Sequence, residues 1–424
     1  MEQRLTFQAR WLLPISGPPI ADGFVTMNDR EVLEISSSPP VGQTVQSLGD
    51  RIVLPRFVNA HTHLEFSSLE SPFVADGGFP SWVREVIKWR QQRDATVLPR
   101  VLPGVLPGVL PEESSLHVAA IAAGVSESLS QGVGLLGEIA TSPWPISGYR
   151  NTLPTVIFLE QLGVLPGQAS ERLSAVASRL GELCNLVGET GVQVGLSPHA
   201  PYSLSQSLFE GMIELGCREQ VPLAMHLAET REEVEWLAGS ANGFSLLQER
   251  LGVPNQQQWR PALDWLIEQL ALAPRALVVH GNYLSRQHWQ QLARNRQRLS
   301  VVYCPRTHHY FGHPRYPLVE MLAEGVRVAI GTDSRASNPN LDVLEELRLI
   351  RRLFPELKPA EILRLATVNG AEALGQADRL GQLAVGMSPS LLSVQCPPGR
   401  EVDPAAWLLD SDAKVEPLHP LPLN

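Results

Sequence analysis

The chain has 424 residues, 44% of them hydrophobic and 18% charged, a composition typical of globular proteins with a sizeable core. Its formal net charge of −10 comes from 44 acidic and 34 basic residues and argues against a surface that binds nucleic acid or anionic membranes. No apolar run approaches the ~18–20 residues of a spanning helix, and the N-terminus lacks the features of a signal peptide. We therefore expect a cytoplasmic protein that acts on a small molecule; a homo-oligomer is left open.

The cysteines are four in number and widely spaced, with no CxxC pair among Cys184, Cys217, Cys304 and Cys396. This spacing argues against a zinc ribbon, a redox dithiol and a disulfide scaffold. Any metal ion must therefore be held by histidine and carboxylate side chains.

Both ends of the chain have a β-like pattern. Residues 1–53 contain short turn-rich segments, FQARWLL, GFVTMND and EVLEISS, and residues 381–396 read in the same way. We expect both ends to pair into one small accessory β-sandwich domain that comprises residues 1–55 and 375–424.

The rest of the chain, residues 56–374, alternates short apolar segments with polar loops and amphipathic helical segments. Several are near-continuous Val, Ile and Leu runs, typical of strands buried on both faces of a parallel sheet. Eight such units favour a (β/α)8 TIM barrel over an open, doubly wound sheet. Such an open sheet would be expected to carry a phosphate-binding GxGxxG motif after its first strand, and this sequence has none there. The eight predicted strands lie in residues 52–63, 132–140, 155–163, 192–202, 221–230, 275–284, 299–307 and 326–334.

An insertion follows the first barrel strand, where residues 97–113 repeat VLP every four residues. Proline at that spacing rules out a continuous helix. The insertion could be an apolar lid or a contact for a partner, but a tolerated expansion of a surface loop is the favoured interpretation because such loops accept insertions.

Two histidines, His61 and His63, stand at the end of the first barrel strand with Thr62 between them. Residues i and i+2 of a strand point to the same side, so both imidazoles are predicted to project into the barrel mouth. One metal ion can bridge imidazoles whose Cα atoms lie ~6–7 Å apart. An HxH pair alone is more often incidental than a pair of metal ligands. The residues at the other strand ends therefore determine whether a metal site is predicted.

Polar residues also occur at the ends of four other predicted strands. His199 follows the fourth, His226 and Glu229 the fifth, His280 the sixth and Asp333 the eighth. Barrel enzymes place their chemistry at this end of the strands. Any one histidine could be a satisfied core residue, but the whole set is unlikely to reach one rim by chance, and it predicts a metal site.

The chain resembles the amidohydrolase superfamily in six motifs: FVNAHTHLE, SPHAPYSLS, HLAET, VVHGNYLS, YCPRTHHYFG and GTDSRASNPNLDVLEELR. It is most similar to the cytosolic deaminase/chlorohydrolase branch, which includes S-adenosylhomocysteine and methylthioadenosine deaminases, guanine deaminase and triazine hydrolases. The motifs span about residues 54 to 350, most of the chain. The resemblance implies a (β/α)8 barrel with one divalent metal ion, and a small β domain made from both termini.

The resemblance also implies roles for particular residues. The metal ligands would be His61, His63, His226 and Asp333, and the catalytic residues would be Glu229, His280 and Asp333. Glu229 would be the general acid and base, and His280 would polarise the attacking water or contact the metal. SPHAPY occupies the place of a carbamylated lysine, which disfavours a second metal. Zinc is expected, with iron or manganese as alternatives because imidazole and carboxylate suit several metals.

The predicted ligand set leaves one coordination position for water, whose pKa a catalytic metal lowers towards ~7. Residues 230–233, TREE, predict a capping box that opens the next helix, so the chain turns at Glu229 and its carboxylate can reach back over the metal. Glu229 would move a proton from the water to a ring nitrogen, and ammonia would leave. The alternative is a first-turn glutamate favoured by the helix dipole.

Substrate contacts are predicted from three regions. Arg306 and His309 lie in the loop after strand seven, whose aromatic residues suit stacking on a heterocycle, although it could also be a plain surface loop. Trp82 and Glu85 follow strand one, where the resemblance implies ribose contacts; helix packing is the other role for Trp82. Asn338 is expected to fix the loop that holds Asp333.

His199 completes the predicted substrate contacts, since the branch places a substrate-orienting histidine there. Two features depart from the family pattern. Glu138 stands where many relatives end the second strand with an aspartate after Gly-Thr-Thr, and residues 386–392 lack the acidic residue of the C-terminal signature. These changes concern the choice of substrate and the accessory domain, not the metal ligands.

Together these patterns predict a hydrolase of carbon–nitrogen bonds other than peptide bonds, which deaminates an amino-substituted purine, a related heterocycle or an adenosine-type nucleoside derivative. Opening of a cyclic amide and hydrolytic dehalogenation use the same chemistry and stay open. A non-catalytic barrel is disfavoured by the intact polar set, and a structural zinc site by the absence of cysteine-rich coordination. The zinc deaminases with HxE and PCxxC motifs are excluded because Cys304 has no partner cysteine.

Overall fold

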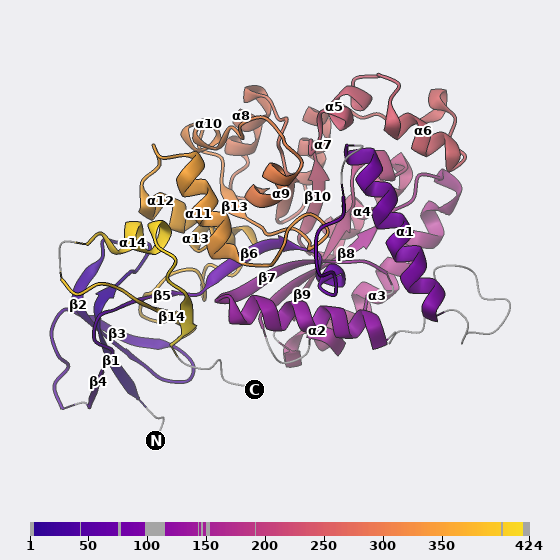
Figure 1. Ribbon diagram of the computed structural model, residues 1–424. Coiled ribbons are helices and arrows are strands. Elements are labelled where there is room, and N and C mark those ends of the chain that lie inside the picture. Colours follow the sequence, from indigo (N-terminus) through magenta and orange to yellow (C-terminus); the bar gives the residue numbers. More distant parts are fainter. Residues whose placement is uncertain are drawn as a thin grey trace.

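The computed structural model describes residues 4–42, 44–74, 78–97, 115–142, 144–145, 147–149, 153–190, 192–399 and 402–418. These residues form two sheets, one of eight strands surrounded by helices and one of seven strands beside it (Figure 1). Of the VLP insertion expected at 97–113, only Val97 belongs to the described residues. No helix in the described ranges combines the length and the apolar character needed to cross a membrane.

The eight-stranded sheet confirms the predicted barrel. Its strands are all parallel and neighbour one another in chain order. Every residue in them except Gln193 is buried, which explains their near-continuous apolar sequences. The strands are β6 (Phe57–Thr62), β7 (Val133–Ala140), β8 (Thr155–Gln161), β9 (Val192–Pro198), β10 (Leu223–Leu227), β11 (Ala276–His280), β12 (Leu299–Tyr303) and β13 (Val328–Ile330).

The first and last strands, β6 and β13, meet through side chains as well as main chain. The buried Asn59 side chain donates from Nδ2 to Thr332 Oγ1 (2.8 Å) and accepts from the Thr332 N–H at Oδ1 (3.0 Å). A single parallel bridge joins Thr62 to Asp333, and the Asp333 N–H donates to the His61 carbonyl (3.1 Å). These bonds bring the ends of the sheet together next to two of the predicted metal ligands.

Helices follow the strands and cover the outside of the barrel (Figure 1). Sequence signals start several of them: Ser205, Thr230 and Asp342 each accept a main-chain N–H as N-caps. The helices are α1 (Phe79–Val97), α2 (Ser115–Ser130), α3 (Ala169–Thr190), α4 (Gln206–Glu219), α5 (Arg231–Leu237), α6 (Gly243–Arg250), α7 (Leu263–Leu270), α8 (Arg286–Arg294), α9 (Pro305–Tyr310), α10 (Leu318–Ala323), α11 (Val343–Leu353), α12 (Pro359–Leu365) and α13 (Val368–Ala373).

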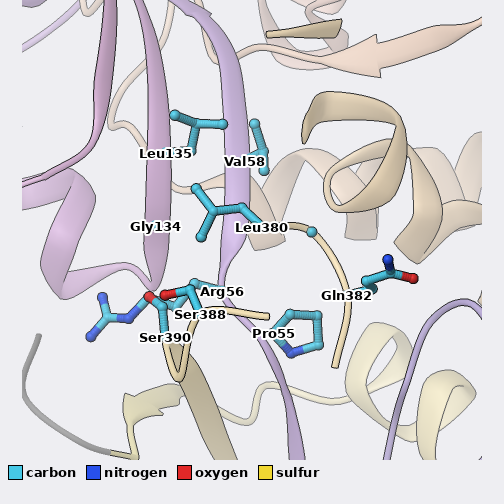
Figure 2. A pocket seen from close by; sticks show the side chains of 10 residues that line it. Pro55, Arg56, Val58, Gly134, Leu135, Leu380, Gln382, Ser388 and Ser390 are labelled. Carbon is cyan, nitrogen blue, oxygen red and sulfur yellow. The ribbon is translucent and has the colours of Figure 1, made fainter. Parts of the chain in front are cut away.

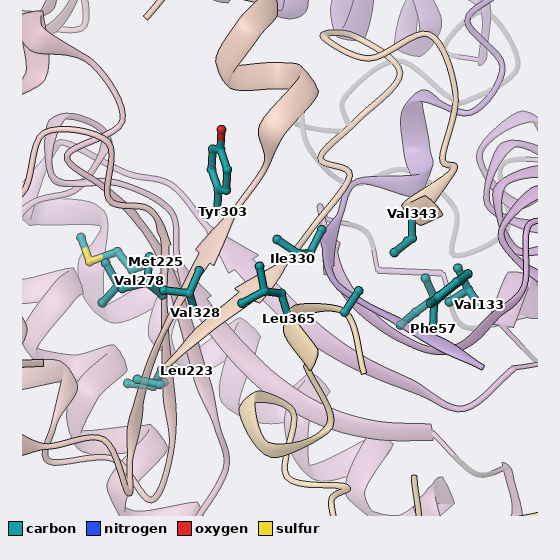
Figure 3. Close-up of a cluster of buried hydrophobic side chains, with 14 of the residues drawn as sticks. Phe57, Val133, Leu223, Met225, Val278, Tyr303, Val328, Ile330, Val343 and Leu365 are labelled. Carbon is teal, nitrogen blue, oxygen red and sulfur yellow. The ribbon is translucent and has the colours of Figure 1, made fainter. Parts of the chain in front are cut away.

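Two hydrophobic clusters divide the barrel strands between them. Met225 and Val278 belong to a large cluster that includes helix residues such as Leu365 of α12, and Figure 3 shows these side chains together. Their neighbours in sequence, Ala224 and Val279, belong to a second cluster. Successive strand residues thus face opposite sides, towards the helices or towards the barrel axis. His226, two residues after Ala224, therefore faces the interior.

The accessory sheet is mixed and joins both ends of the chain, as predicted. β14 runs antiparallel to β5, with Leu391 opposite Pro55, and β5 pairs with β1. α14 (Pro404–Asp410) connects the two C-terminal strands. The strands are β1 (Leu5–Leu12), β2 (Ile20–Met27), β3 (Val32–Ser36), β4 (Val45–Ser47), β5 (Arg51–Pro55), β14 (Leu391–Gln395) and β15 (Val415–Pro417). The exact domain limits, 1–55 with 375–424 and 56–374, stay a prediction.

The expected strand 52–63 is divided between the two sheets at Arg56. The Arg56 N–H donates to the Ser390 carbonyl (3.1 Å), and its guanidinium donates from Nη1 to the carbonyl of Val133 (3.3 Å) and to that of Leu129 (3.5 Å) in the last turn of α2. Burial lowers the pKa of Arg56 to about 10. The surrounding cavity (Figure 2) has a volume of about 10 Å³, room for about one water molecule, so it is no substrate site.

Candidate active site and metal centre

Four histidines and an aspartate meet at the carboxyl ends of the barrel strands. His63 Nε2 lies 3.3 Å from His226 Nε2, and Asp333 Oδ1 lies 3.8 Å from His61 Nε2 and 3.9 Å from His63 Nε2. The ring of His280 lies 5.4 Å from that of His226, centre to centre. All five side chains are buried. The structure therefore brings strands β6, β10, β11 and β13 together at one point.

This cluster fits a divalent cation. Both ring nitrogens of His61 and Nδ1 of His63 are buried and have no hydrogen-bond partner among the described residues. Buried polar atoms are normally paired, so Nε2 of His61, which faces Asp333 Oδ1, is available to a cation. Two imidazole nitrogens about 2.1 Å from a tetrahedral metal lie about 3.4 Å apart, close to the 3.3 Å between His63 and His226. The protein thus has a buried histidine and aspartate metal site.

The histidines are held in the neutral form that binds metals. Burial lowers the pKa of His61, His63 and His280 well below the usual value, and neighbouring histidines lower it further. Burial also lowers the pKa of His226 to about 3. Neutral imidazoles have a free lone pair, so a cation need not compete with a proton at neutral pH.

Asp333 is fixed by the loop that follows β13. Its Oδ1 accepts the Ser334 N–H (2.8 Å), and its Oδ2 accepts the Ser337 hydroxyl (3.3 Å). Burial raises its pKa to about 6. Asn338 Nδ2 donates to the Thr332 carbonyl (2.8 Å) and to Glu346 Oε1 (2.7 Å), so its observed bonds hold this loop.

Glu229 lies beside the cluster, with Oε1 3.5 Å from His280 Nε2. Thr230 caps α5 as predicted, because its hydroxyl accepts the Glu233 N–H (3.1 Å). The Glu233 carboxylate reaches back and accepts the N–H groups of Ala228 and Glu229, each at 2.9 Å. Burial, then the charges of Asp333 and Glu233, raise the pKa of Glu229 well above its usual value. A carboxylate with a raised pKa is a stronger base than an exposed glutamate.

His199 lies next to the metal site and is partly accessible. Its ring lies 4.9 Å from that of His226, and 20% of its side chain is exposed. Nδ1 lies 2.7 Å from the Ser203 hydroxyl, and Nε2 lies 3.9 Å from Glu160 Oε1. This location is compatible with the predicted substrate-orienting role, which stays a prediction.

Sequence reasoning missed a buried acidic network near His199. Glu160 of β8 accepts the Thr141 hydroxyl (3.0 Å), and Glu65 forms an ion pair with Arg90 of α1 (2.6 Å). The signal was present, because an acidic residue interrupts the apolar strand TVIFLEQ. Glu160, His199 and His226 could also hold a cation, but His226 already belongs to the first cluster, so they form no independent second site.

Glu138 has a structural task at the end of β7. Its carboxylate accepts the Leu64 N–H (3.1 and 3.0 Å to the two oxygens) and the Tyr149 hydroxyl (3.0 Å). Leu64 directly follows His63, so Glu138 fixes the turn after a predicted ligand. Burial raises the pKa of Glu138 well above its usual value.

Three predicted substrate residues form no hydrogen bond or ion pair with the histidine cluster within the described part of the chain. Arg306 Nη1 donates to Asn340 Oδ1 (2.7 Å), His309 is exposed, and Glu85, 46% exposed at its side chain, lies 3.5 Å from Lys88. Their contact with substrate stays a prediction.

Trp82 packs in an aromatic cluster near the barrel mouth. Its ring lies 5.5 Å from Phe79 and 5.3 Å from Phe311, and its Nε1 donates to the Ala336 carbonyl (3.0 Å) in the loop after Asp333. Tyr202, 5.8 Å from His199, belongs to the same cluster. Trp82 therefore ties α1 to the loop that carries Asp333.

Comparison with solved structures supports the same fold. The chain superposes on Helicobacter pylori aminofutalosine deaminase with a TM-score of 0.80, at 22% identity over 98% of both chains. The same enzyme in complex with methylthio-coformycin gives 0.79, at 22% identity over 97% of both chains. A Xanthomonas campestris adenosine deaminase with bound zinc gives 0.74, at 22% identity over 99% of this chain and 94% of that one.

Sequence comparison gives the family. The chain is 30% identical over 337 residues to aminodeoxyfutalosine deaminase of Deinococcus radiodurans, covering 76% of this chain and 73% of the relative. The profile of the Amidohydrolase family matches residues 52–415, which include the whole barrel and the histidine cluster. The resemblance seen in the motifs is thereby confirmed, and the chain belongs to the amidohydrolase family.

Proposed function

We propose that this protein hydrolytically deaminates an adenosine-type nucleoside derivative, with Glu229 as general acid and base. The observation that carries the proposal is the Glu229 carboxylate 3.5 Å from His280, at the edge of a buried cluster that fits a cation. A carboxyl group at this place can accept a proton from an attacking water and donate one to a substrate ring.

We propose a single zinc ion held by His61, His63, His226 and Asp333. Zinc in a relative of the same fold supports this choice, and iron and manganese are the alternatives that these ligands also suit. A divalent cation in such a site supplies Lewis-acid activation of water near neutral pH.

The protein's own residues would then move the protons. Glu229 takes a proton from the attacking water and delivers it to the ring nitrogen next to the carbon that bears the amino group. Its raised pKa makes the carboxylate a better acceptor for the proton of the water. His280, 3.5 Å from Glu229, would orient the water, and His199, partly exposed beside the ligands, would orient the substrate. The remaining hydrogen of the added water then passes to the amino group, so that the carbon–nitrogen bond breaks and ammonia leaves.

The substrate class rests on relatives. One relative is an aminodeoxyfutalosine deaminase, and the Helicobacter enzyme of the same fold binds methylthio-coformycin, a nucleoside analogue. A small adenine-type nucleoside with a variable substituent is therefore the first class to test.

The test is ammonia release by the zinc-loaded protein from adenosine, methylthioadenosine, S-adenosylhomocysteine and aminodeoxyfutalosine. A cyclic amide and a chlorotriazine, followed by ring opening and chloride release, represent the other reactions of the superfamily. Turnover of a nucleoside with loss of one ammonia supports the proposal. Turnover of only the cyclic amide or the chlorotriazine would replace it, and an inactive zinc-loaded protein would point to a binding barrel.

A further inference from the structure

Three strand ends at the metal centre adopt a backbone conformation that residues with a Cβ rarely adopt. Ala228 after β10 has φ 52°, His280 at the end of β11 has φ 68°, and Asp333 after β13 has φ 56°. The left-handed region is unfavourable for such residues. It persists only where surrounding interactions over-determine it, and such residues gather at functional sites.

The left-handed turns redirect the side chains that the site needs. On β11, Val279 faces the barrel interior, so strict alternation would send His280 towards the helices. Instead the His280 ring lies 5.8 Å from that of His61. After β10, the turn at Ala228 places Glu229 3.5 Å from His280.

A buried side chain from another element holds each of these turns. The Glu233 carboxylate on α5 accepts the N–H groups of Ala228 and Glu229 at 2.9 Å. The Tyr316 hydroxyl, from the segment before α10, donates to the His280 carbonyl at 2.9 Å. The Thr62 hydroxyl on β6 donates to the Asp333 carbonyl at 2.9 Å. All three holding residues are at most 1% exposed, namely Glu233, Tyr316 and Thr62.

We propose that Glu233, Tyr316 and Thr62 are positioning residues that hold the strand ends of this centre in the left-handed conformation. Their side-chain hydrogen bonds to the main chain hold Glu229, His280 and Asp333 towards one point. The inference rests on the proposed function of the centre, and it adds the residues on which the geometry of that centre depends.

Tyr316 offers the sharpest test, because the chain contains a matched control. Tyr316 and Tyr303 are stacked with ring centres 3.8 Å apart and an interplanar angle of 9°, and both are buried. The Tyr303 hydroxyl has no hydrogen-bond partner among the described residues. Tyr316→Phe and Tyr303→Phe therefore remove the same atom from one stacked pair, but only the first removes a bond to a strand end.

Glu233 allows a second, independent test. In Glu233→Gln one carboxylate oxygen becomes an NH₂ group, which cannot accept a main-chain N–H, so one of the two bonds is lost. Glycine adopts the left-handed conformation about as readily as the right-handed one. If Glu233 serves to hold Ala228 in that conformation, Glu233→Gln should lower kcat or speed metal release less in a protein that also carries Ala228→Gly.

The experiment measures the visible absorption spectrum of the cobalt(II)-loaded protein, its rate of cobalt release to a chelator, and kcat and KM for the best substrate of the panel. We expect Tyr316→Phe to change the spectrum, because His280 is stacked on the proposed ligand His226, and to lower kcat or speed cobalt release roughly 10-fold or more, the size usual for residues just outside the ligands of a metal. KM should stay within about 2-fold, because the substrate contacts are untouched. Tyr303→Phe should match the wild type in every measurement.

The proposal is overturned if Tyr316→Phe and Tyr303→Phe give the same spectrum, the same rate of cobalt release and the same kcat. It is also overturned if Glu233→Gln changes these quantities as much in a protein with Gly at position 228 as in one with Ala. The spectrum and the release rate need no substrate, so they decide the positioning role even for a protein that turns nothing over. A wild type that releases no ammonia, together with a changed spectrum in Tyr316→Phe alone, would reject the proposed function and keep the positioning role.

Discussion

The side chain of Asn59 forms two hydrogen bonds with Thr332, which lies 273 positions later in the chain. The bonds join the first barrel strand to the end of the last one. His61 follows Asn59 by two residues and Asp333 follows Thr332 directly, so the same contact that closes the barrel sets the distance between two proposed metal ligands. Closure of the fold and assembly of the site therefore share this pair of residues.

Asn59→Ala should destabilise the barrel and loosen the metal site together. The Thr332 N–H would remain buried without its partner, which costs about 1–3 kcal/mol in the free energy of unfolding. Urea unfolding of the metal-free protein measures the loss, and zinc titration measures the affinity. Gln193→Ala, at the exposed position of β9, should change stability by less than about 0.5 kcal/mol. Equal stability of Asn59→Ala and Gln193→Ala would contradict this role of Asn59.

Glu229→Gln should keep the metal but lose turnover. The amide preserves the shape of the side chain yet cannot carry a proton between water and substrate, so kcat should fall by about 10²–10⁴-fold. Metal analysis and steady-state ammonia release measure the two effects. Glu235→Gln, at an exposed position on α5, the helix that follows Glu229, is the matched control and should retain full activity. A Glu229→Gln enzyme with wild-type kcat would remove Glu229 from the mechanism.

His61→Ala should lower the metal content. The His61 ring lies within 5.0 Å of the rings of both His63 and His226, so its loss leaves a gap at the centre of the ligand set. After dialysis against a weak chelator, we expect clearly less than one metal ion per chain by elemental mass spectrometry. His288→Ala, a histidine paired with Asp264 outside the cluster, should retain the wild-type content. Full occupancy in His61→Ala would show that the metal is bound elsewhere.

Removal of the metal should lower the thermal stability. A ligand that binds only the folded state stabilises it by about 2.7 kcal/mol at 100 times its dissociation constant. A strong chelator should therefore reduce Tm by several degrees in the wild type, and re-addition of zinc should restore it. The same treatment should leave Tm of His61→Ala nearly unchanged. An equal drop in both proteins would mean that the chelator acts through another site.

The eight barrel strands and the histidine cluster were predictable because their signals are local. Buried parallel strands need continuous apolar runs, and the polar residue that ends each run points to the mouth of a barrel. The cap at Thr230 was also readable, since a capping residue acts on the turn that directly follows it. These features depend on short stretches of sequence and can be predicted without knowledge of tertiary contacts.

Other features depend on contacts between distant residues and could not be read from the sequence. The apolar run 52–63 is divided at Arg56, because β5 pairs with β14 from the far end of the chain. The carbonyl of His280, which has a left-handed conformation, accepts a hydrogen bond from Tyr316, 36 positions later. The expected loop after strand seven forms the short helix α9, whose periodicity buries His308 and exposes His309.

The network of Glu65, Arg90 and Glu160 illustrates the same limit. Each residue lies on a different element, and only the fold brings Arg90 of α1 to the end of β8. A buried acidic residue within an apolar strand is a usable signal in sequence, but its partner cannot be identified before the helix after β6 has been placed.

The central claim is that one cation is held at the carboxyl ends of β6, β10 and β13. Anomalous diffraction at the zinc absorption edge, from crystals of the zinc-loaded protein, tests it most directly. We predict a single strong peak bounded by His61, His63, His226 and Asp333. A peak at any other place, or apolar packing with no density between these side chains, would contradict the account.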